Sequence, residues 1–324
     1  MWKIIGHTRA VRALQDSLAS ERLPHAWLLT GPMGVGKTRL ALELAKALNC
    51  TGDERPDQVC VHCRQIEHGT HPDVAIIERP EGKDSIAIQQ VRELRTTASL
   101  RPFQARFRVY VVAGAEALTL QAADALLKTL EEPQVQVVLV LTALDVSGIP
   151  ETVVSRCRRL ALQPVSEAQI AGALREMGQD ETRAGRVARL AQGSLGWAVR
   201  AAKDARLVTR QEEALDQMAR VPELRLDERL ALAESLTAGK RERTEVRRVL
   251  EALALLARDL LLTHEGLEPR LVRIDQRDML ARQVRSFSLA QIRDHLQRLK
   301  GAMERLDSNV DPRLLLEALL VEMP

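Results

Sequence analysis

Hydrophobic and polar positions in the first half of the chain form short apolar runs separated by longer segments with helical spacing. The apolar runs have the length of buried strands and fall at residues 26–30, 73–77, 108–112, 136–141 and 158–162. The segments between them repeat apolar residues every three or four positions, at 39–48, 86–100 and 120–130. Strands that alternate with helices predict an α/β domain whose mainly parallel sheet is covered on both faces.

The second half of the chain shows helical periodicity alone. Pro164 ends the alternating pattern, and Ser166 with Gln169 has the spacing of a capping box that opens a helix. A small helical unit is expected up to about residue 203, ending in the turn at Gly193 and Ser194. Longer amphipathic runs follow at 226–237, 241–263 and 289–306. The basic stretch 240–248 mixes acids with its bases, which favours a solvated helix face over a binding patch.

Residues 31–38, GPMGVGKT, match the phosphate-loop pattern G-x-x-x-x-G-K-[ST]. The loop follows a predicted strand and opens a predicted helix, which is the context that this pattern requires. Its glycines let backbone N–H groups point at an anion, Lys37 is expected to reach the terminal phosphates of ATP, and the Thr38 hydroxyl is expected to bind Mg²⁺. The alternative is a glycine-rich turn that binds nothing.

Composition narrows the class of protein. The chain has 324 residues, which predicts two or three domains, and aromatic residues make up only 2%, so its core must consist of Leu, Val and Ala. A net charge of +3 argues against a protein that coats polyanions but permits a local basic face. The longest apolar run, 137–141, is too short to cross a bilayer, and no leader pattern is visible. A cytoplasmic location with reduced or metal-bound cysteines is therefore expected.

Taken together, the motifs resemble those of bacterial DNA polymerase III clamp loader subunits, which are AAA+ proteins. The resemblance rests on HAWLLTGPMGVGKT at 25–38, on residues 2–7 before it, on ADALLKTLEEP at 123–133 and on SRC at 155–157. It extends over the whole chain, since residues 308–317 fit the last helix of the family's collar.

This resemblance implies a P-loop AAA+ domain at 1–163 with a zinc-module insert at 50–63, a helical lid at 164–203 and an all-α oligomerisation collar at 204–324. It also implies that ATP with Mg²⁺ is held by Trp2, Ile5, Gly31, Pro32, Met33, Gly34, Val35, Gly36, Lys37 and Thr38.

The strand at 108–112 should lead into two carboxylates, one for the Mg²⁺ shell and one to orient the attacking water. The chain has Ala113 and Gly114 instead, neither of which can bind a cation. Glu116 is the only nearby acid. We expect it to be a surface residue, and a displaced catalytic carboxylate is the alternative.

Two more positions depart from the motor subunits of the family. Ala143 and Leu144 stand where those subunits carry a polar sensor residue, although Thr142 lies slightly early, and Gly196 stands where their lid carries an arginine. Such a site is expected to hold ATP and to cleave it poorly, a profile that resembles the delta-prime type in the variety that keeps its nucleotide loop. A hydrolysing gamma- or tau-type motor is the alternative. A small-molecule kinase is disfavoured because it leaves the SRC and LEEP segments unexplained.

Arg156 occupies the family's arginine-finger position in the SRC triplet. The resemblance implies that its planar cationic fork reaches the ATP of a neighbouring subunit and stabilises charge on the γ-phosphate. A salt-bridged arginine at the sheet edge is the alternative. Arg158 and Arg159 follow directly, so chemistry alone leaves open which arginine points outward.

Three cysteines, Cys50, Cys60 and Cys63, lie in the insert after the nucleotide-loop helix. The resemblance implies a four-cysteine zinc module there, with Asp57 in the place of the second cysteine. Zn²⁺ accepts carboxylate oxygen, so Cys50, Asp57, Cys60 and Cys63 are expected to close a structural tetrahedral site. A module that has lost its metal is the alternative reading of the insert, and the alternative fourth ligands are His62 and His68.

The partners that the resemblance implies are the other clamp loader subunits of a hetero-oligomeric ring, the sliding clamp and primed DNA. Four arginines around the helix at 86–100 are expected either to meet DNA phosphates or to be solvated, namely Arg92, Arg95, Arg101 and Arg106. Nothing indicates base recognition, and no membrane partner is expected.

Overall fold

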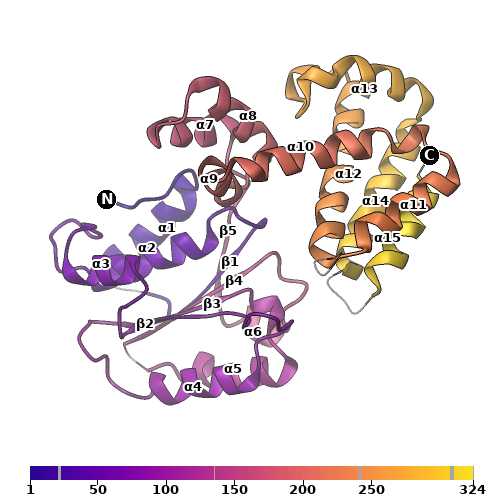
Figure 1. The fold of residues 1–324 in the computed structure, drawn as a ribbon. Coiled ribbons are helices and arrows are strands. Elements are labelled where there is room, and N and C mark those ends of the chain that lie inside the picture. The colour runs from indigo at the N-terminus through magenta and orange to yellow at the C-terminus, as the bar shows by residue number, and fades with distance from the viewer. Residues whose placement is uncertain (21–22, 135, 240–241, 307–309, 324) are drawn as a thin grey trace. The chain divides into compact units, whose positions relative to one another are not determined.

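The computed structural model describes residues 1–20, 23–134, 136–239, 242–306 and 310–323 of the chain (Figure 1). The chain divides into two compact units, Met1–Ala202 and Lys203–Pro324. The first unit contains a parallel sheet between helices, and the second consists of helices in its described part. The predicted fold class, an α/β domain followed by an all-α region, is confirmed.

The sheet of the first unit has five parallel strands in the order β2-β3-β4-β1-β5. Their bounds are Ala26–Thr30 (β1), Val74–Ile77 (β2), Arg108–Ala113 (β3), Val137–Ala143 (β4) and Arg158–Ala161 (β5). Each lies within two residues of its predicted run. Because β1 lies between β4 and β5, the loop that follows Thr30 starts at the carboxyl edge of the sheet with a strand on each side.

Both faces of the sheet are covered by helices, which explains why the inner strands β1 and β4 are nearly continuous apolar runs. On one face, alternate residues such as Leu28, Val112 and Leu141 pack beneath α4 (Ile88–Ala98) and α5 (Leu120–Glu131). The opposite face is covered by α2 (Lys37–Asn49), and Figure 1 shows α1 and α3 on that same side. β4 is buried at every position.

The remaining helices of the first unit surround this core or follow it. They are α1 (Thr8–Ala19), α3 (Val61–Glu67), η1 (Ala115–Ala117), α6 (Glu151–Val154), α7 (Glu167–Glu176), α8 (Glu181–Ala191) and α9 (Leu195–Lys203). The capping box that opens α7 is confirmed, because Ser166 and Gln169 bond to each other's backbone N–H groups. The helical unit does not stop at Gly193: that residue turns with φ +84°, and α9 follows.

The second unit is built around the long helix α12 (Glu242–His264), whose apolar side is buried by its neighbours. Those neighbours are α10 (Ala205–Ala219), α11 (Leu226–Thr237), η3 (Glu268–Arg270), α13 (Arg277–Gln283), η5 (Val284–Ser286), α14 (Leu289–Leu306) and α15 (Pro312–Val321). The short turns η2 (Val221–Glu223) and η4 (Ile274–Gln276) contact α10 and α13. The predicted helical runs at 226–237 and 289–306 are confirmed to the residue. Residues 240, 241 and 308–309 of the predicted segments lie outside the described residues. None of the helices described is both long and apolar enough to cross a membrane.

Candidate nucleotide and metal sites

The phosphate loop leaves β1 through a bend that only glycine permits. Gly31 has φ +147°, and its N–H donates to the carbonyls of Ala143 and Leu144 at 3.2 and 3.0 Å. A Cβ added at Gly31 would lie 2.4 Å from the carbonyl oxygen of Leu162. The loop is therefore hydrogen-bonded to the end of β4 and packs closely against Leu162, directly after β5.

Lys37, the first residue of α2, places its ammonium group over this loop. Its Nζ donates to the carbonyls of Gly31 and Pro32 at 2.6 and 2.8 Å. Burial lowers the pKa of Lys37, and the charge of Glu116 opposes that change. The first N–H groups of α2, including that of Thr38, have no acceptor within the helix, and the helix dipole favours an anion there. A phosphate chain with Mg²⁺ fits this arrangement of donors.

The helix α9 contacts the phosphate loop through backbone. The N–H of Gly196 donates to the carbonyl of Gly34 at 2.7 Å. A Cβ added at Gly34 would lie 2.1 Å from Ser194 Oγ, and one added at Gly196 would lie 3.1 Å from the Gly34 oxygen. Gly196 therefore has a structural reason to lack a side chain, since it packs against the nucleotide loop.

The segment before α1 also lies against the loop. His7, which has φ +54°, places Nε2 3.0 Å from the carbonyl oxygen of Val35. Gly6 packs beside Val165, at the start of the lid. Trp2 and Ile5, the two nucleotide contacts predicted outside the loop, are half-buried in this segment.

The carboxyl ends of β3 and β4 are joined where the hydrolytic groups of a motor would stand. The N–H of Gly114 donates to both the carbonyl and the hydroxyl of Thr142, at 3.1 and 3.2 Å. The Thr142 hydroxyl is thus engaged by the backbone at the sheet edge. Glu116 is exposed in η1, close enough for its charge to act on Lys37.

Arg156 follows α6 and pairs with α5. Its guanidinium lies 2.7 Å from a carboxylate oxygen of Glu131 and donates to the carbonyl of Thr152 at 2.8 Å. Both charged side chains remain partly exposed, 36% for the arginine and 49% for the glutamate. The next arginine is occupied elsewhere, since the Arg158 guanidinium lies over the Trp27 ring, 5.2 Å from its centroid.

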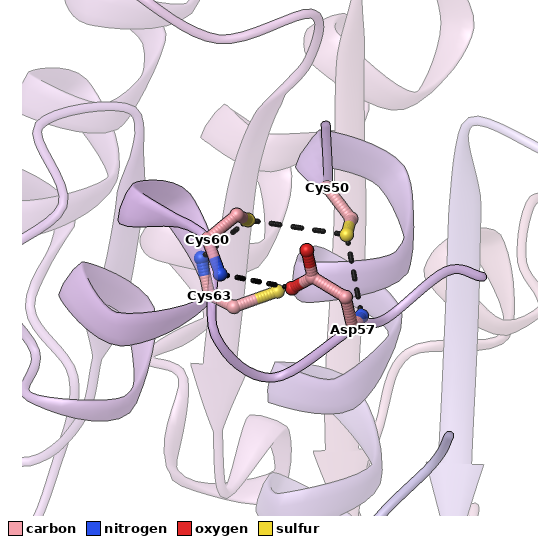
Figure 2. Close-up of side chains that lie close together, drawn as sticks. All are labelled: Cys50, Asp57, Cys60 and Cys63. Carbon is pink, nitrogen blue, oxygen red and sulfur yellow. Dashed lines mark hydrogen bonds between the residues drawn. The ribbon is translucent and has the colours of Figure 1, made fainter. Parts of the chain in front are cut away.

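Four side chains of the insert converge as a metal ligand set would. Cys50, Asp57, Cys60 and Cys63 place one ligand atom each within 4.8 Å of the others, and Figure 2 shows the side chains pointing toward one another. Cys50 ends α2, Cys60 caps α3 and Cys63 lies in its first turn. The sulfurs of Cys50 and Cys60 are 3.9 Å apart. Tetrahedral zinc with bonds of about 2.3 Å separates its sulfurs by about 3.8 Å, so the spacing fits.

The electrostatics of this cluster suit a cation. The Asp57 carboxylate accepts from the N–H groups of Cys60 and Val59, both at 3.0 Å, and these bonds hold the pKa of Asp57 well below its usual range. Burial raises the pKa of the Cys63 and Cys50 thiols, and a bound cation would offset this by replacing their protons.

The alternative histidine ligands lie elsewhere. Nδ1 of His62 is 2.9 Å from Nε2 of His71, and His68 ends α3. Among the residues described, neither belongs to the converging group, so the structure favours Asp57 as the fourth member.

Two family models match the chain. The model for the DNA polymerase III delta subunit matches residues 6–166, and the model for the C-terminal part of that subunit matches residues 223–323. The chain belongs to the DNA polymerase III delta subunit family. This confirms the resemblance found in the sequence.

Individual relatives refine the placement within DNA polymerase III. The delta-prime subunit of Bacillus subtilis is 28% identical over 97% of this chain and 94% of its own length. The gamma subunit of Buchnera aphidicola is 40% identical, but over 52% of this chain, which spans only about half (46%) of that relative. A solved gamma subunit-related protein from Thermotoga maritima is a distant structural neighbour, with a TM-score of 0.42 at 16% identity, covering 96% of this chain and 99% of its own. Among these sequence relatives, full-length similarity is to delta-prime.

One part of the site in this delta-family chain has no signal in the sequence. Glu43 and Lys46 of α2 are fully buried, although their spacing is that of an ordinary surface pair. Gln58 of the insert and Glu67 of α3 complete the network around them. Only the buried setting reveals these residues, because a charged residue on an amphipathic helix otherwise indicates a solvated face.

Proposed function

We propose that this chain is a delta-prime-type subunit of a DNA polymerase III clamp loader that binds ATP with Mg²⁺ and has little or no ATPase activity of its own. The observation that carries the proposal is a complete phosphate loop beside a strand, β3, that ends in Ala113 and Gly114 instead of the two carboxylates of a motor. Lys37 and the amides of α2 supply the groups that hold phosphates. Ala113 and Gly114 supply nothing that could bind the Mg²⁺ shell or orient water.

In this role Arg156 serves a neighbouring subunit. An exposed ion pair such as that with Glu131 stabilises a fold by only about 0–1 kcal/mol, so the arginine can leave it for a phosphate at small cost. A guanidinium fork on the γ-phosphate of a neighbour would stabilise charge that builds up during cleavage. The chain would thus complete the ATPase site of a neighbouring subunit, and would help to load the sliding clamp onto primed DNA.

Zinc is proposed as a structural cofactor of the insert. The donors Cys50, Asp57, Cys60 and Cys63 have the right chemistry and spacing for it. Four protein ligands leave no position for an activated water, so the ion would fasten the insert rather than take part in a reaction.

DNA contact is proposed through backbone phosphates. A surface hollow beside α4 and α5 has three cations in its lining, Arg92, Arg95 and Lys128, against one acid, Glu132. Its other lining residues are Thr96, Ala98, Ser99, Thr129 and Gln134. Arg101 and Arg106 are exposed in the loop after α4. Cations and hydroxyls hold phosphates without distinguishing bases.

The second candidate is a gamma- or tau-type motor, and the position of Glu116 favours it. The charge of this carboxylate acts on Lys37, so the displaced acid lies near the phosphate loop. In a motor, Glu116 would have to orient the attacking water without the second carboxylate that normally holds the Mg²⁺ shell.

One experiment separates the two functions. ATP affinity is measured by calorimetry with Mg²⁺, and turnover is measured for the chain alone and after assembly with clamp loader subunits and primed DNA. The proposal expects binding with turnover near background for the chain alone. Steady-state hydrolysis by the isolated chain that is abolished in Glu116→Gln would establish the motor instead.

A further inference from the structure

A buried charge network lies between the cysteine cluster and the nucleotide loop. Glu43 and Lys46 of α2 have side chains that are 0% and 1% exposed and lie 2.8 Å apart. Lys46 Nζ also donates to Gln58 Oε1 at 3.0 Å and to the carboxylate of Glu67. Buried charges of this kind depend on every partner, since removing one leaves an uncompensated ion.

On one side this network reaches the metal ligands. Gln58 stands between Asp57 and Cys60 and has φ +67°, a conformation that few side-chain-bearing residues adopt. The Asp57 carboxylate holds that turn by accepting from the N–H groups of Val59 and Cys60. The direction of the Gln58 side chain therefore depends on the same loop that presents two of the four ligands.

On the other side the network holds the segment that precedes α1. Glu43 Oε2 accepts from the backbone N–H of Lys3 at 2.9 Å and from Gln58 Nε2 at 2.6 Å. Gln58 Nε2 is also 3.1 Å from the carbonyl oxygen of Met1, and the Met1 nitrogen donates to the carbonyl of Pro56. The segment is thus held by the insert at Met1, by α2 at Lys3 and by the phosphate loop at His7.

The network also reaches the helix that carries the nucleotide groups. Arg39, directly after Thr38, lies 3.2 Å from Glu43 and 2.7 Å from Glu67. One face of α2 therefore carries Arg39, Glu43 and Lys46 toward the insert, while the first turn of the same helix presents Lys37 and Thr38.

We infer that Glu43 is a positioning residue that couples the cysteine cluster to the nucleotide site. A metal ion bound by the cluster fixes Gln58, and Gln58 with Glu43 then holds residues 1–5 against the nucleotide loop. This rests on the proposed function for its second ligand, ATP. Zinc is expected to raise ATP affinity, and ATP must raise zinc affinity by the same factor, because coupling between two binding sites is reciprocal.

The first test needs no nucleotide. Hydrogen exchange of backbone amides is measured on the full chain with zinc and after removal of zinc by a chelator. The Lys3 amide, which donates to Glu43, is expected to exchange at least about tenfold faster without the metal, together with its neighbours in residues 2–5. Unchanged exchange in this segment would overturn the coupling, whether or not the chain binds ATP.

The second test measures affinity for a fluorescent ATP analogue with Mg²⁺, again with and without zinc. Removal of zinc is expected to weaken binding by about fivefold or more, the usual lower bound for coupled sites. In Glu43→Gln the zinc content should be retained while the effect of zinc on affinity falls below about twofold. Glu54→Gln, an exposed carboxylate of the insert, is the matched control and should keep the full effect.

A second variant keeps the test decisive if Glu43→Gln does not fold. Glu43→Gln leaves Lys46 without its buried ionic partner. Gln58→Ala removes the bonds to Met1, Glu43 and Lys46 but leaves Lys46 paired with Glu43 and Glu67. Gln58→Ala should also abolish the effect of zinc on affinity. Equal affinity of the unmodified chain with and without zinc would overturn the inference. If neither form binds nucleotide, the proposed function fails, and the exchange measurement still decides the coupling.

Discussion

The guanidinium of Arg156 and the carboxylate of Glu131 form an ion pair of 2.7 Å that joins the SRC triplet after α6 to the LEEP segment of α5. Two motifs that lie 25 positions apart in the sequence, 156 − 131, are therefore neighbours at one edge of the sheet domain. Both side chains are partly exposed, so the pair orients the arginine while leaving it accessible to solvent.

The first prediction concerns this arginine. Arg156→Ala should leave the folding and ATP affinity of this chain unchanged, and should lower ATPase and clamp-loading rates of the reconstituted complex. An arginine finger raises the rate of phosphoryl transfer about 10³–10⁵-fold at the site that it serves. The total ATPase rate of the complex should fall by less, because other sites with their own fingers continue to work. Arg156→Lys should rescue poorly, because an ammonium lacks the planar fork.

The control for this prediction is Arg159→Ala, an exposed arginine on β5. It should leave the loading rate near that of the unmodified complex. Normal loading by complexes that carry Arg156→Ala would show that the finger is wrongly assigned, and would make Arg158 or Arg159 the candidate.

The second prediction concerns the phosphate loop. Lys37→Ala should weaken ATP binding by about 2–5 kcal/mol, the usual cost of removing one partner of a desolvated charge pair, which is about 30-fold or more in affinity. Lys83→Ala, in an exposed loop, should bind as the unmodified chain does. Calorimetric titration with Mg-ATP provides the measurement, and undiminished binding by Lys37→Ala would place the nucleotide elsewhere.

The third prediction concerns the metal. One equivalent of zinc should co-purify, and Cys60→Ser should release it under conditions where Cys157→Ser retains it, because Cys157 lies outside the converging group. Asp57→Cys should bind zinc at least as tightly, since a thiolate replaces the carboxylate. Metal content measured by atomic spectroscopy decides this. A metal-free protein purified under zinc-replete, reducing conditions would rule out the site.

The fourth prediction concerns Asp73, which is buried beneath the loop after α4. Its carboxylate accepts from three successive amides, those of residues 103–105, at 2.7–3.1 Å, and from Arg108 at 3.0 Å. Asp73→Asn should destabilise the chain by about 3–5 kcal/mol, since it leaves Arg108 buried without its ionic partner. Urea unfolding measures this loss, and Asp84→Asn, an exposed aspartate, should change stability by less than about 0.5 kcal/mol.

Asp73 also predicts a pH dependence. Burial by itself would raise the pKa of Asp73, but the amide hydrogen bonds and Arg108 outweigh it and hold the pKa below its usual value. The stability that this carboxylate contributes is therefore complete above an unfolded-state pKa of about 3.9 and is lost as the pH falls through the lower folded-state value. The difference in unfolding free energy between the unmodified chain and Asp73→Asn should shrink below about pH 4. A constant difference down to pH 2 would contradict the assignment.

The fifth prediction concerns DNA. Arg92→Ala combined with Lys128→Ala should weaken binding of primed DNA by the assembled complex equally for templates of different sequence. Each phosphate contact that is lost should reduce the slope of log affinity against log salt by about 0.9 for duplex DNA. Fluorescence anisotropy at several salt concentrations measures both effects, and an unchanged slope would show that these cations face solvent.

The sequence by itself determined the parts of this protein that depend on neighbours along the chain. The strands, the capping box at Ser166 and the phosphate loop depend on apolar spacing, glycine position and helix-start chemistry, all of which act over a few residues. The missing carboxylates at Ala113 and Gly114 are equally local, because these two positions end β3 and begin the loop after it. The resemblance to clamp loader subunits implied the group of Cys50, Asp57, Cys60 and Cys63, with His62 and His68 as alternative fourth ligands, and the structure brings the first four together.

Only the tertiary structure decided which charged residues are buried and which distant segments meet. Glu43 and Lys46 have the spacing of a solvated helix face, and they are buried because the insert folds back over α2. Gly196 packs closely against the backbone of Gly34, far away in the sequence. The physical reason is that helix and strand periodicity shows which face of an element is buried. It does not show which distant segment packs against that face, and that segment supplies the partner of a buried charge.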